Sequence, residues 1–154
     1  MVISQVLETP KELLKSPTYL LKRIGIIAKE KSIDAFDSAP AGPFTYSVLA
    51  VLEGGACRTQ SSIAEVLRYD PSYLVGVLDE LEQSGLVERK RDTADRRRHV
   101  VSMTPAGAKE LQRLREVRAG VDEDLLSGLN ATERKTLLGL LTKALAAHDS
   151  RYEG

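Results

Sequence analysis

The sequence predicts a mainly α-helical domain that carries one small β-hairpin, and three observations lead to this fold class. Apolar residues recur three and four positions apart over several long stretches, which is the spacing of a helical stripe. Two short β-prone runs, LVER and HVVSM, flank a polar loop between residues 86 and 103. A length of 154 residues, with 42% hydrophobic and 29% charged residues, is typical of one soluble globular domain.

Two helices are expected in the N-terminal part of the chain. The first begins at Ser16-Pro17 and reaches about Phe36. Its apolar residues form a surface too wide for one face packed on a small domain: Tyr19, Leu20, Leu21, Ile24, Ile27 and Ala28. A loop rich in Pro and Ala, residues 37–43, ends this pattern. The second helix then runs through residues 46–52 and stops at Gly54-Gly55.

A pair of shorter helices follows. The first has its apolar stripe at Ile63, Val66 and Leu67, and the second has its stripe at Leu74, Val77, Leu78 and Leu81. Asp70 is a good N-cap for the second helix, and Pro71 suits its first position, where the missing N–H costs nothing. Gly85 can take the left-handed conformation that closes a helix. These signals predict a helix, a short turn and a helix.

The hairpin that comes next is strongly basic. Between Val87 and Arg98, six Lys or Arg residues stand against three acids. Such a hairpin is suited to a polyanion, because Lys and Arg release the counterions condensed on phosphates; a solvated hairpin with ordinary surface charge is the alternative. Two helices followed by a hairpin are the order of a winged helix-turn-helix, in which the second helix enters the major groove.

The last third of the chain is expected to be helical. Thr104 caps a long helix with Pro105 first inside it, and apolar residues continue to Leu125. Asn130 caps a final helix, with Glu133 completing a capping box. The first and last helices carry more apolar surface than the central lobe can cover, which favours a second copy as partner. A helical subdomain that closes on itself is the alternative.

The stretch from Phe44 to Leu111 resembles the multiple antibiotic resistance regulator (MarR) family of bacterial transcription factors. The matching segments are FTYSVLAVLEG, SSIAEVL, DPSYLVGVLDELEQSGLVER and DTADRRRHVVSMTPAG. The resemblance implies a single domain over residues 1–154, with a winged helix-turn-helix DNA-binding lobe at 44–111. It also implies a homodimer through helices at 17–36 and 131–148, and a pseudo-palindromic double-stranded DNA operator.

The resemblance assigns roles to the wing. In the family, the acid of the wing sets the loop by pairing with a neighbouring Arg, and the Arg two positions later enters the minor groove; here these are Asp95 and Arg97. A narrow minor groove concentrates negative potential and attracts a guanidinium. The candidate phosphate contacts are residues of the wing and of the preceding helix start, where a serine can equally be only the N-cap: Ser61, Ser62, Lys90, Arg91, Arg96 and Arg98.

The second helix of the pair departs from the family expectation. The positions left to face the groove are Ser72, Tyr73, Val75 and Gly76, because the apolar stripe must face the core. Pro71 and Gly76 lie where relatives often carry polar or basic side chains, and neither can make a bidentate hydrogen bond to a base. We therefore expect the wing and the shape of the DNA to carry much of the affinity.

A small-molecule effector is also implied by the resemblance, because relatives bind small aromatic or phenolic anions in a cleft between the lobe and the dimerisation helices. The candidate lining residues are Tyr19, Arg23, Tyr46 and Arg58, although core packing explains the tyrosines equally well. The expected function is a dimeric, sequence-specific repressor that the ligand releases. A redox role for Cys57 is the less favoured reading of the single cysteine.

Composition excludes several other classes. The formal net charge is zero, so DNA binding requires a basic face rather than a basic whole. One Cys and two distant His make a metal site improbable, and we expect no cofactor. The sequence shows no nucleophile–base pair or phosphate loop, which argues against an enzyme. No apolar run is long enough for a membrane span, and no signal peptide begins the chain, so we expect a cytoplasmic location. A winged-helix module that binds protein instead of DNA is the alternative function.

Overall fold

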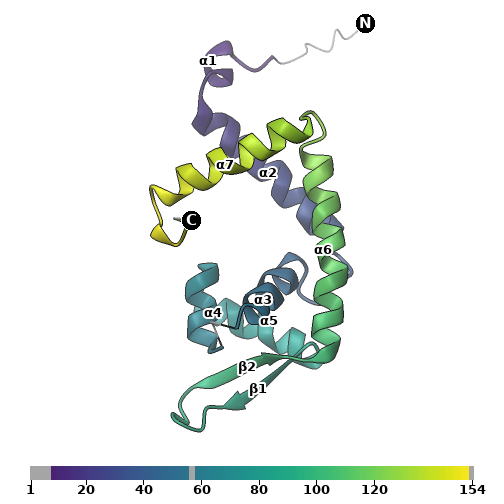
Figure 1. Cartoon of the computed structure of the whole chain (residues 1–154), viewed down its shortest axis with the longest axis vertical. Helices are drawn as coiled ribbons and strands as arrows, with labels where there is room; N and C mark the ends of the chain where they lie inside the picture. The colour runs from purple at the N-terminus through teal and green to yellow at the C-terminus, as the bar shows by residue number, and fades with distance from the viewer. Residues whose placement is uncertain (1–7, 56–57, 153–154) are drawn as a thin grey trace, which may run out of the picture. The chain divides into compact units, whose positions relative to one another are not determined.

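The computed structural model describes residues 8–55 and 58–152 (Figure 1), and these divide into two compact units with the boundary between Val121 and Asp122. The elements, in chain order, are α1 (Lys11–Leu14), α2 (Pro17–Ala35), α3 (Pro43–Glu53), α4 (Gln60–Leu67), α5 (Pro71–Gln83), β1 (Val87–Arg91), β2 (His99–Met103), α6 (Pro105–Leu125), α7 (Ala131–Ala146) and a short 3-10 helix, η1 (Ser150–Tyr152). The mainly helical fold with one hairpin is confirmed.

The central lobe of the first unit is built from α3, α4, α5 and the antiparallel hairpin β1–β2. Its core is a continuous apolar cluster contributed by all five elements, in which the largest fully buried side chains include Leu49, Ile63, Leu74, Leu78 and Val101. The hairpin pairs Val87 with Met103 at its base and Arg91 with His99 near the loop. The lobe is therefore a winged helix-turn-helix, with the hairpin as its wing.

Local signals place α5 as the sequence predicts. The Asp70 carboxylate accepts hydrogen bonds from the backbone N–H groups of Ser72 (2.9 Å) and Tyr73 (3.1 Å). Gly85 has φ +71°, and the N–H of Leu86 donates to the carbonyl of Leu81 at 2.9 Å. The left-handed conformation expected at Gly85 is present, and it turns the chain directly from α5 into β1.

The connection between the wing and α6 is unusually close. Gly107 is buried against the backbone where β1 begins, so that a Cβ atom there would lie 2.1 Å from the carbonyl oxygen of Leu86. Thr104 fastens the same junction: its N–H donates to that oxygen at 3.1 Å, and its hydroxyl donates to the carbonyl of Gly85 at 2.6 Å. The start of α6 is thereby held against the end of α5.

A smaller apolar cluster lies outside the lobe in the first unit. Phe36 and Ala39, which follow α2, are buried with Leu114 and Val121 of α6. By contrast, the large apolar residues along α2 are exposed, as expected of a surface too wide for one face: Leu20, Leu21, Ile24, Ile26 and Ile33.

The second unit consists of the end of α6, α7 and η1. The capping box predicted at the start of α7 is present: Asn130 and Glu133 exchange backbone-to-side-chain hydrogen bonds of 3.0 and 2.8 Å. The helix exposes a row of leucines: Leu138, Leu140, Leu141 and Leu145. Within the described ranges, no helix is both long and apolar enough to cross a membrane.

Candidate nucleic-acid interface

Helix α5 turns one side to the core and the opposite side outward. Leu74, Val77, Leu78 and Leu81 are buried, as the apolar stripe predicts. The four positions expected to face a groove are all exposed: Ser72, Tyr73, Val75 and Gly76. No neighbouring atom lies within 4 Å of the point where a Cβ would stand on Gly76. The outward side of α5 is therefore smooth and poor in hydrogen-bond donors.

Tyr73 is fixed by two aromatic neighbours. Its ring lies 5.1 Å from that of Phe44 and 6.3 Å from that of Tyr69, both in edge-to-face geometry. Burial raises the pKa of the Tyr73 phenol, and the nearby Tyr69 and Glu80 add to the rise. The phenol is thus a neutral donor in ordinary buffers, held on the exposed side of α5 by ring packing.

The start of α4 differs from the sequence expectation. The N-cap is Thr59, and neither Ser61 nor Ser62 has that role. The hydroxyl of Thr59 accepts from the N–H of Ser62 at 3.2 Å, and the hydroxyl of Ser62 accepts from the N–H of Thr59 at 3.1 Å. Because this capping box occupies the Ser62 hydroxyl, the exposed Ser61 is the better placed of the two serines for an external phosphate.

The wing loop is organised around two aspartates. Asp95 Oδ1 accepts from the N–H of Arg97 at 3.0 Å, and Asp92 Oδ1 accepts from the N–H of Ala94 at 2.9 Å. The guanidinium groups of Arg97 and Arg98 lie 3.6 and 3.7 Å from the Asp95 carboxylate. The Arg97 side chain is nevertheless 94% exposed, so its pairing with Asp95 leaves it projecting into solvent beside the exposed Arg96.

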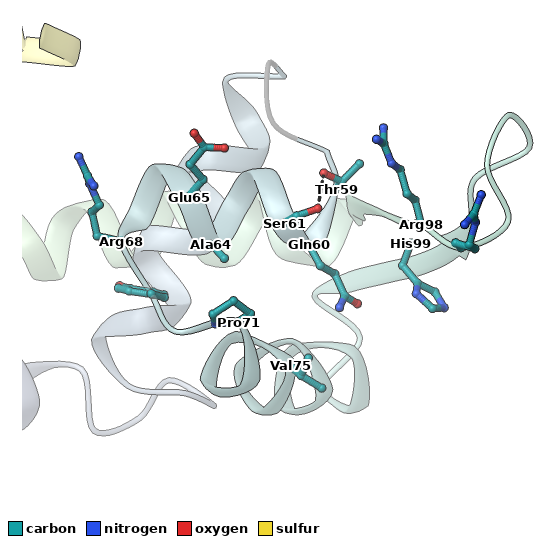
Figure 2. Close-up of a pocket in the computed structure, with 12 residues that line it drawn as sticks. Thr59, Gln60, Ser61, Ala64, Glu65, Arg68, Pro71, Val75, Arg98 and His99 are labelled. Carbon is teal, nitrogen blue, oxygen red and sulfur yellow. Dashed lines mark hydrogen bonds between the residues drawn. The ribbon is translucent and has the colours of Figure 1, made fainter.

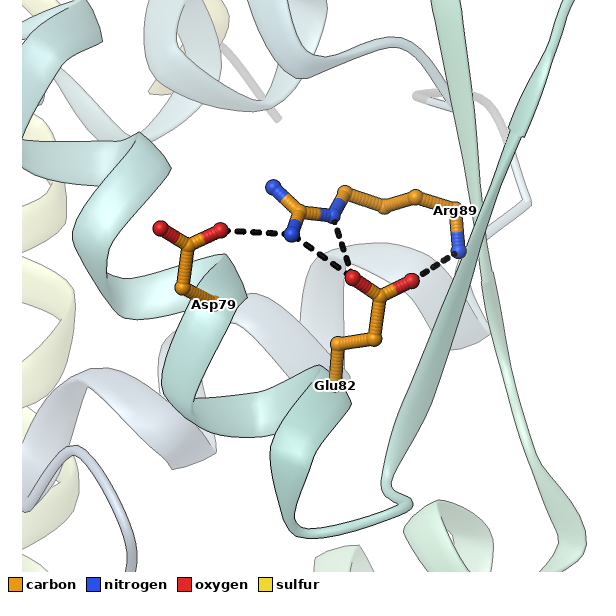
Figure 3. Close-up of polar contacts among 3 residues, drawn as sticks. All are labelled: Asp79, Glu82 and Arg89. Carbon is orange, nitrogen blue, oxygen red and sulfur yellow. Dashed lines mark hydrogen bonds and ion pairs between the residues drawn. The ribbon is translucent and has the colours of Figure 1, made fainter.

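The basic residues of β1 do not share one direction. Lys90 is exposed and pairs with Glu88 at 3.3 Å, whereas Arg91 is exposed opposite His99. Arg89 instead turns toward α5, and its side chain is only 18% exposed (Figure 3). Arg89, one of the six basic residues counted in the wing, is therefore paired within the molecule and does not project into solvent.

Arg89 joins the wing to α5 through several hydrogen bonds (Figure 3). Its Nε and Nη2 donate to Glu82 Oε2 at 3.0 and 2.7 Å, and its backbone N–H donates to Glu82 Oε1 at 3.0 Å. Nη2 also reaches Asp79 Oδ1 at 2.5 Å. The hydrogen bonds from Arg89 hold the pKa of Glu82 below its usual range, and His99 contributes a smaller lowering. This cluster fixes the direction of the wing relative to α5.

An open hollow of about 560 Å3 lies between α4, α5 and the loop end of the wing (Figure 2). Its walls carry Ser61 and Gln60 from α4, Val75 from α5, and Arg97, Arg98 and His99 from the wing. A second hollow of about 390 Å3 is lined by Gln60, Val75, Glu82, Arg89 and His99. Candidate residues from the two helices and the wing thus meet on one face.

The expected effector residues lie apart from this face. Tyr46 packs its ring 6.0 Å from that of Phe36, with the Arg118 guanidinium 5.9 Å from its centroid. Tyr19 and Arg23 lie on α2, and Arg58 Nε donates to the carbonyl of Gly55 at 3.3 Å. None of these four candidates lines either hollow described above. Cys57 falls outside the described residues.

Three side chains of the face were absent from the site expected from the sequence, although strand alternation could have indicated two of them. His99 shares its side of β2 with the buried Val101, which directs it toward the helices rather than away from them. The same alternation places Arg89 on the side of β1 that carries the buried Val87. Gln60 has no such signal, because its orientation depends on where the α4 N-cap lies.

Comparison with known proteins gives consistent results. The MarR family model matches residues 46–99. The transcriptional repressor CouR, solved bound to a 23-mer DNA duplex, is 31% identical, with a TM-score of 0.79 over 90% of this chain and 99% of that chain. The transcriptional regulator HosA of Escherichia coli is 30% identical over 65% of this chain and 74% of its own length. The chain belongs to the MarR family.

A third relative extends the likeness within the MarR family. The putative transcriptional regulatory protein for the hcr operon of Thauera aromatica is 37% identical over 70% of this chain. The match covers 64% of that protein, so this chain spans less than two thirds of its length. The matched range 46–99 contains all of α4, α5, β1 and the wing loop, and it ends at the first residue of β2, His99.

Proposed function

We propose that this chain is a sequence-specific DNA-binding regulator of transcription that acts as a repressor. The observation that carries the proposal is the single face on which the outward side of α5, the start of α4 and the basic wing meet. A helix in the major groove with a basic wing beside it is a known mode of reading DNA. CouR, at 31% identity, is named a repressor and was solved on DNA.

The proposal includes a homodimer. Leu20 and Leu21 on α2, and Leu138 and Leu140 on α7, are between 46% and 67% exposed, so both helices offer apolar surface. Burying apolar surface contributes roughly 25 cal/mol per Å2, which favours a second copy of the chain over solvent. A two-fold dimer would present two lobes to half-sites about one helical turn apart.

The proposal also includes the release of DNA by a small aromatic or phenolic ligand. The Tyr46 ring lies 6.0 Å from the Phe36 ring and 5.9 Å from the Arg118 guanidinium, and aromatic rings with a cation nearby are chemically suited to an aromatic anion. If a ligand lowers DNA affinity, DNA must lower ligand affinity by the same factor. Calorimetry with aromatic acids, with and without DNA, tests this; equal affinities would exclude the compound as an effector.

The test of DNA binding compares the wing with α5. Wild-type protein is titrated by fluorescence anisotropy against the DNA upstream of its own gene, at several salt concentrations. Arg97→Ala removes an inserted, charged contact and should cost roughly 2–3 kcal/mol, while lowering the slope of log affinity against log salt by about one per half-site. Tyr73→Phe keeps the ring packing and removes one hydroxyl, so about 1 kcal/mol is expected.

Two further variants separate charge from geometry. Arg97→Lys keeps the charge and should keep the salt slope while losing part of the affinity. Lys109→Ala removes an exposed charge of α6 that lines neither hollow, and it should change little. If Tyr73→Phe is more damaging than Arg97→Ala, or if Arg97→Ala leaves the slope unchanged, the wing does not dominate binding. If the wild type binds no DNA, the module that binds protein becomes the better reading.

A further inference from the structure

Three side chains line both hollows of the face: Gln60 from α4, Val75 from α5 and His99 from β2. Figure 2 shows Gln60 reaching from α4 toward α5, and His99 extending on the same side from the end of β2 next to the wing loop, while Arg98 points the other way. An amide and an imidazole thus flank an apolar surface.

The geometry of double-stranded DNA determines which part of the duplex would lie against this hollow. On the proposed function, α5 enters the major groove and the wing enters the adjacent minor groove. The two grooves of a duplex are separated by one sugar–phosphate strand. That strand must therefore cross the face between α5 and the wing, and the hollow of about 560 Å3 is the recess found there.

We propose that Gln60 and His99 form the seat for a phosphodiester group of the strand that separates the two grooves, with Val75 against the deoxyribose. The Gln60 amide N–H and a ring N–H of His99 donate to the phosphate oxygens, and both are donors that proteins commonly use on phosphates. The proposal rests on the DNA-binding function above and adds two residues to its site. It also makes binding depend on the charge of one imidazole.

The charges around His99 set the conditions for this dependence. The charged groups that line a hollow with His99, or pair with it across the hairpin, are Glu82 on α5, Arg89 and Arg91 on β1, Arg97 and Arg98 on the wing, and Glu65 and Arg68 on α4. Of these, Arg98, Glu65 and Arg68 point away from α5 (Figure 2). The Glu82 carboxylate is already bound by Arg89, so it does not compete fully for the imidazole. Cations outnumber carboxylates in this set, and a phosphate entering the seat therefore meets a positive field.

Protonation of His99 should therefore strengthen DNA binding. Imidazole is the side chain whose charge ordinarily changes between pH 5 and 8. The neutral ring offers one donor, whereas the protonated ring offers two donors and a positive charge. At an exposed site one added charge pair is worth about a fivefold change in affinity per half-site.

The experiment measures dissociation constants at about pH 6 and about pH 8, at fixed ionic strength. The probe is a duplex that the wild-type protein selects from a random pool. The chain has two histidines, so His148→Gln is the matched control for His99→Gln. We expect a tightening at low pH of roughly fivefold per half-site in wild type and in His148→Gln, and its loss in His99→Gln.

A chemical change in the DNA identifies the partner atom. Single neutral methylphosphonates are placed along the strand between the major-groove half-site and the neighbouring minor groove. One position should abolish the pH dependence of the wild type and have no further effect on His99→Gln, because the two changes remove the same contact. Non-additive losses at one linkage would support the seat.

Gln60→Ala separates a backbone contact from a base contact. A phosphate contact carries no sequence information, so affinity should fall by a similar factor on the selected duplex and on unrelated duplexes. A loss confined to one base position would overturn the proposed role of Gln60, since glutamine also reads adenine.

Two results would refute the seat while leaving DNA binding intact. The first is an equal pH dependence of DNA binding in wild type and in His99→Gln. The second is a pH dependence of the wild type that persists whichever phosphate is replaced by a methylphosphonate. A wild-type protein that binds no duplex at either pH would overturn both this inference and the proposed function.

Discussion

Gly107 lies where the wing, the end of α5 and the start of α6 meet, and replacing it by alanine should destabilise the protein strongly. The added Cβ would lie 2.1 Å from the Leu86 carbonyl oxygen and 2.8 Å from Met103 Cγ. The methionine side chain is flexible and can move away. The carbonyl cannot, because it accepts the N–H of Thr104 at 3.1 Å and follows the left-handed turn at Gly85.

The size of the effect follows from this geometry. An ordinary carbon contact is about 3.5 Å long, so the start of α6 must move by about 1 Å or more. Overpacking of a tight interior costs roughly 1–3 kcal/mol, and the displaced Thr104 hydrogen bonds add about 1 kcal/mol. Alanine recovers about 1 kcal/mol of helix propensity relative to glycine. We expect a net loss of about 2 kcal/mol in the free energy of unfolding of Gly107→Ala.

The assay is urea unfolding followed by far-ultraviolet circular dichroism, with Gly120→Ala as the matched control. Gly120 lies in the same helix, and nothing is within 4 Å of its Cβ position. Gly120→Ala should therefore stabilise the protein by about 0.5–1 kcal/mol. Gly107→Ala should lower the urea midpoint by roughly 1 M at the slopes usual for small proteins. If Gly107→Ala unfolds at the wild-type midpoint, the close approach of α6 to β1 is wrong.

Two further predictions concern the Arg89 cluster and α7. Glu82→Gln should cost about 1 kcal/mol at neutral pH; because the folded pKa of Glu82 is lowered, this difference should shrink as the pH falls below about 4. Unfolding curves from neutral to acidic pH check it, and a pH-independent difference would contradict it. Leu138→Glu places a charge on a side chain that is 67% exposed, so it should produce monomers without unfolding the chain. Ser102→Glu, at an exposed position on the wing, should leave the dimer intact. Sedimentation at micromolar concentration decides, and an unchanged mass for Leu138→Glu would remove α7 from the interface.

Much of the fold followed from local sequence signals. The Asp70 cap, Pro71 in the first turn, the left-handed Gly85 and the Asn130 capping box are all present. Each of these depends on a few neighbouring residues, so the sequence alone contains the information. The wing, too, was predicted from two β-prone runs, although β1 extends two residues beyond the expected LVER to Arg91.

The remaining features of the site depend on the direction in which each side chain points, and the sequence composition does not contain this information. The N-cap expected for α4 was wrong because Thr59, Ser61 and Ser62 all have side chains able to cap a helix. The observed N-cap is Thr59, in a helix that buries Ile63 and Ala64. The inward turn of Arg89 was missed because a count of basic residues treats every guanidinium as exposed. The DNA contacts themselves stay a prediction, since exposure on one face does not by itself identify a partner.

The Arg89 cluster has a consequence for the kind of DNA that would be tolerated. Because Arg89 ties β1 to Glu82 and Asp79 of α5, the elements assigned to two adjacent grooves move as one piece. On the proposed function, their separation is then fixed by the protein, and the duplex must supply the matching twist and groove width. Base steps that no side chain touches would therefore be selected for their stiffness, because over- or underwinding them costs elastic energy.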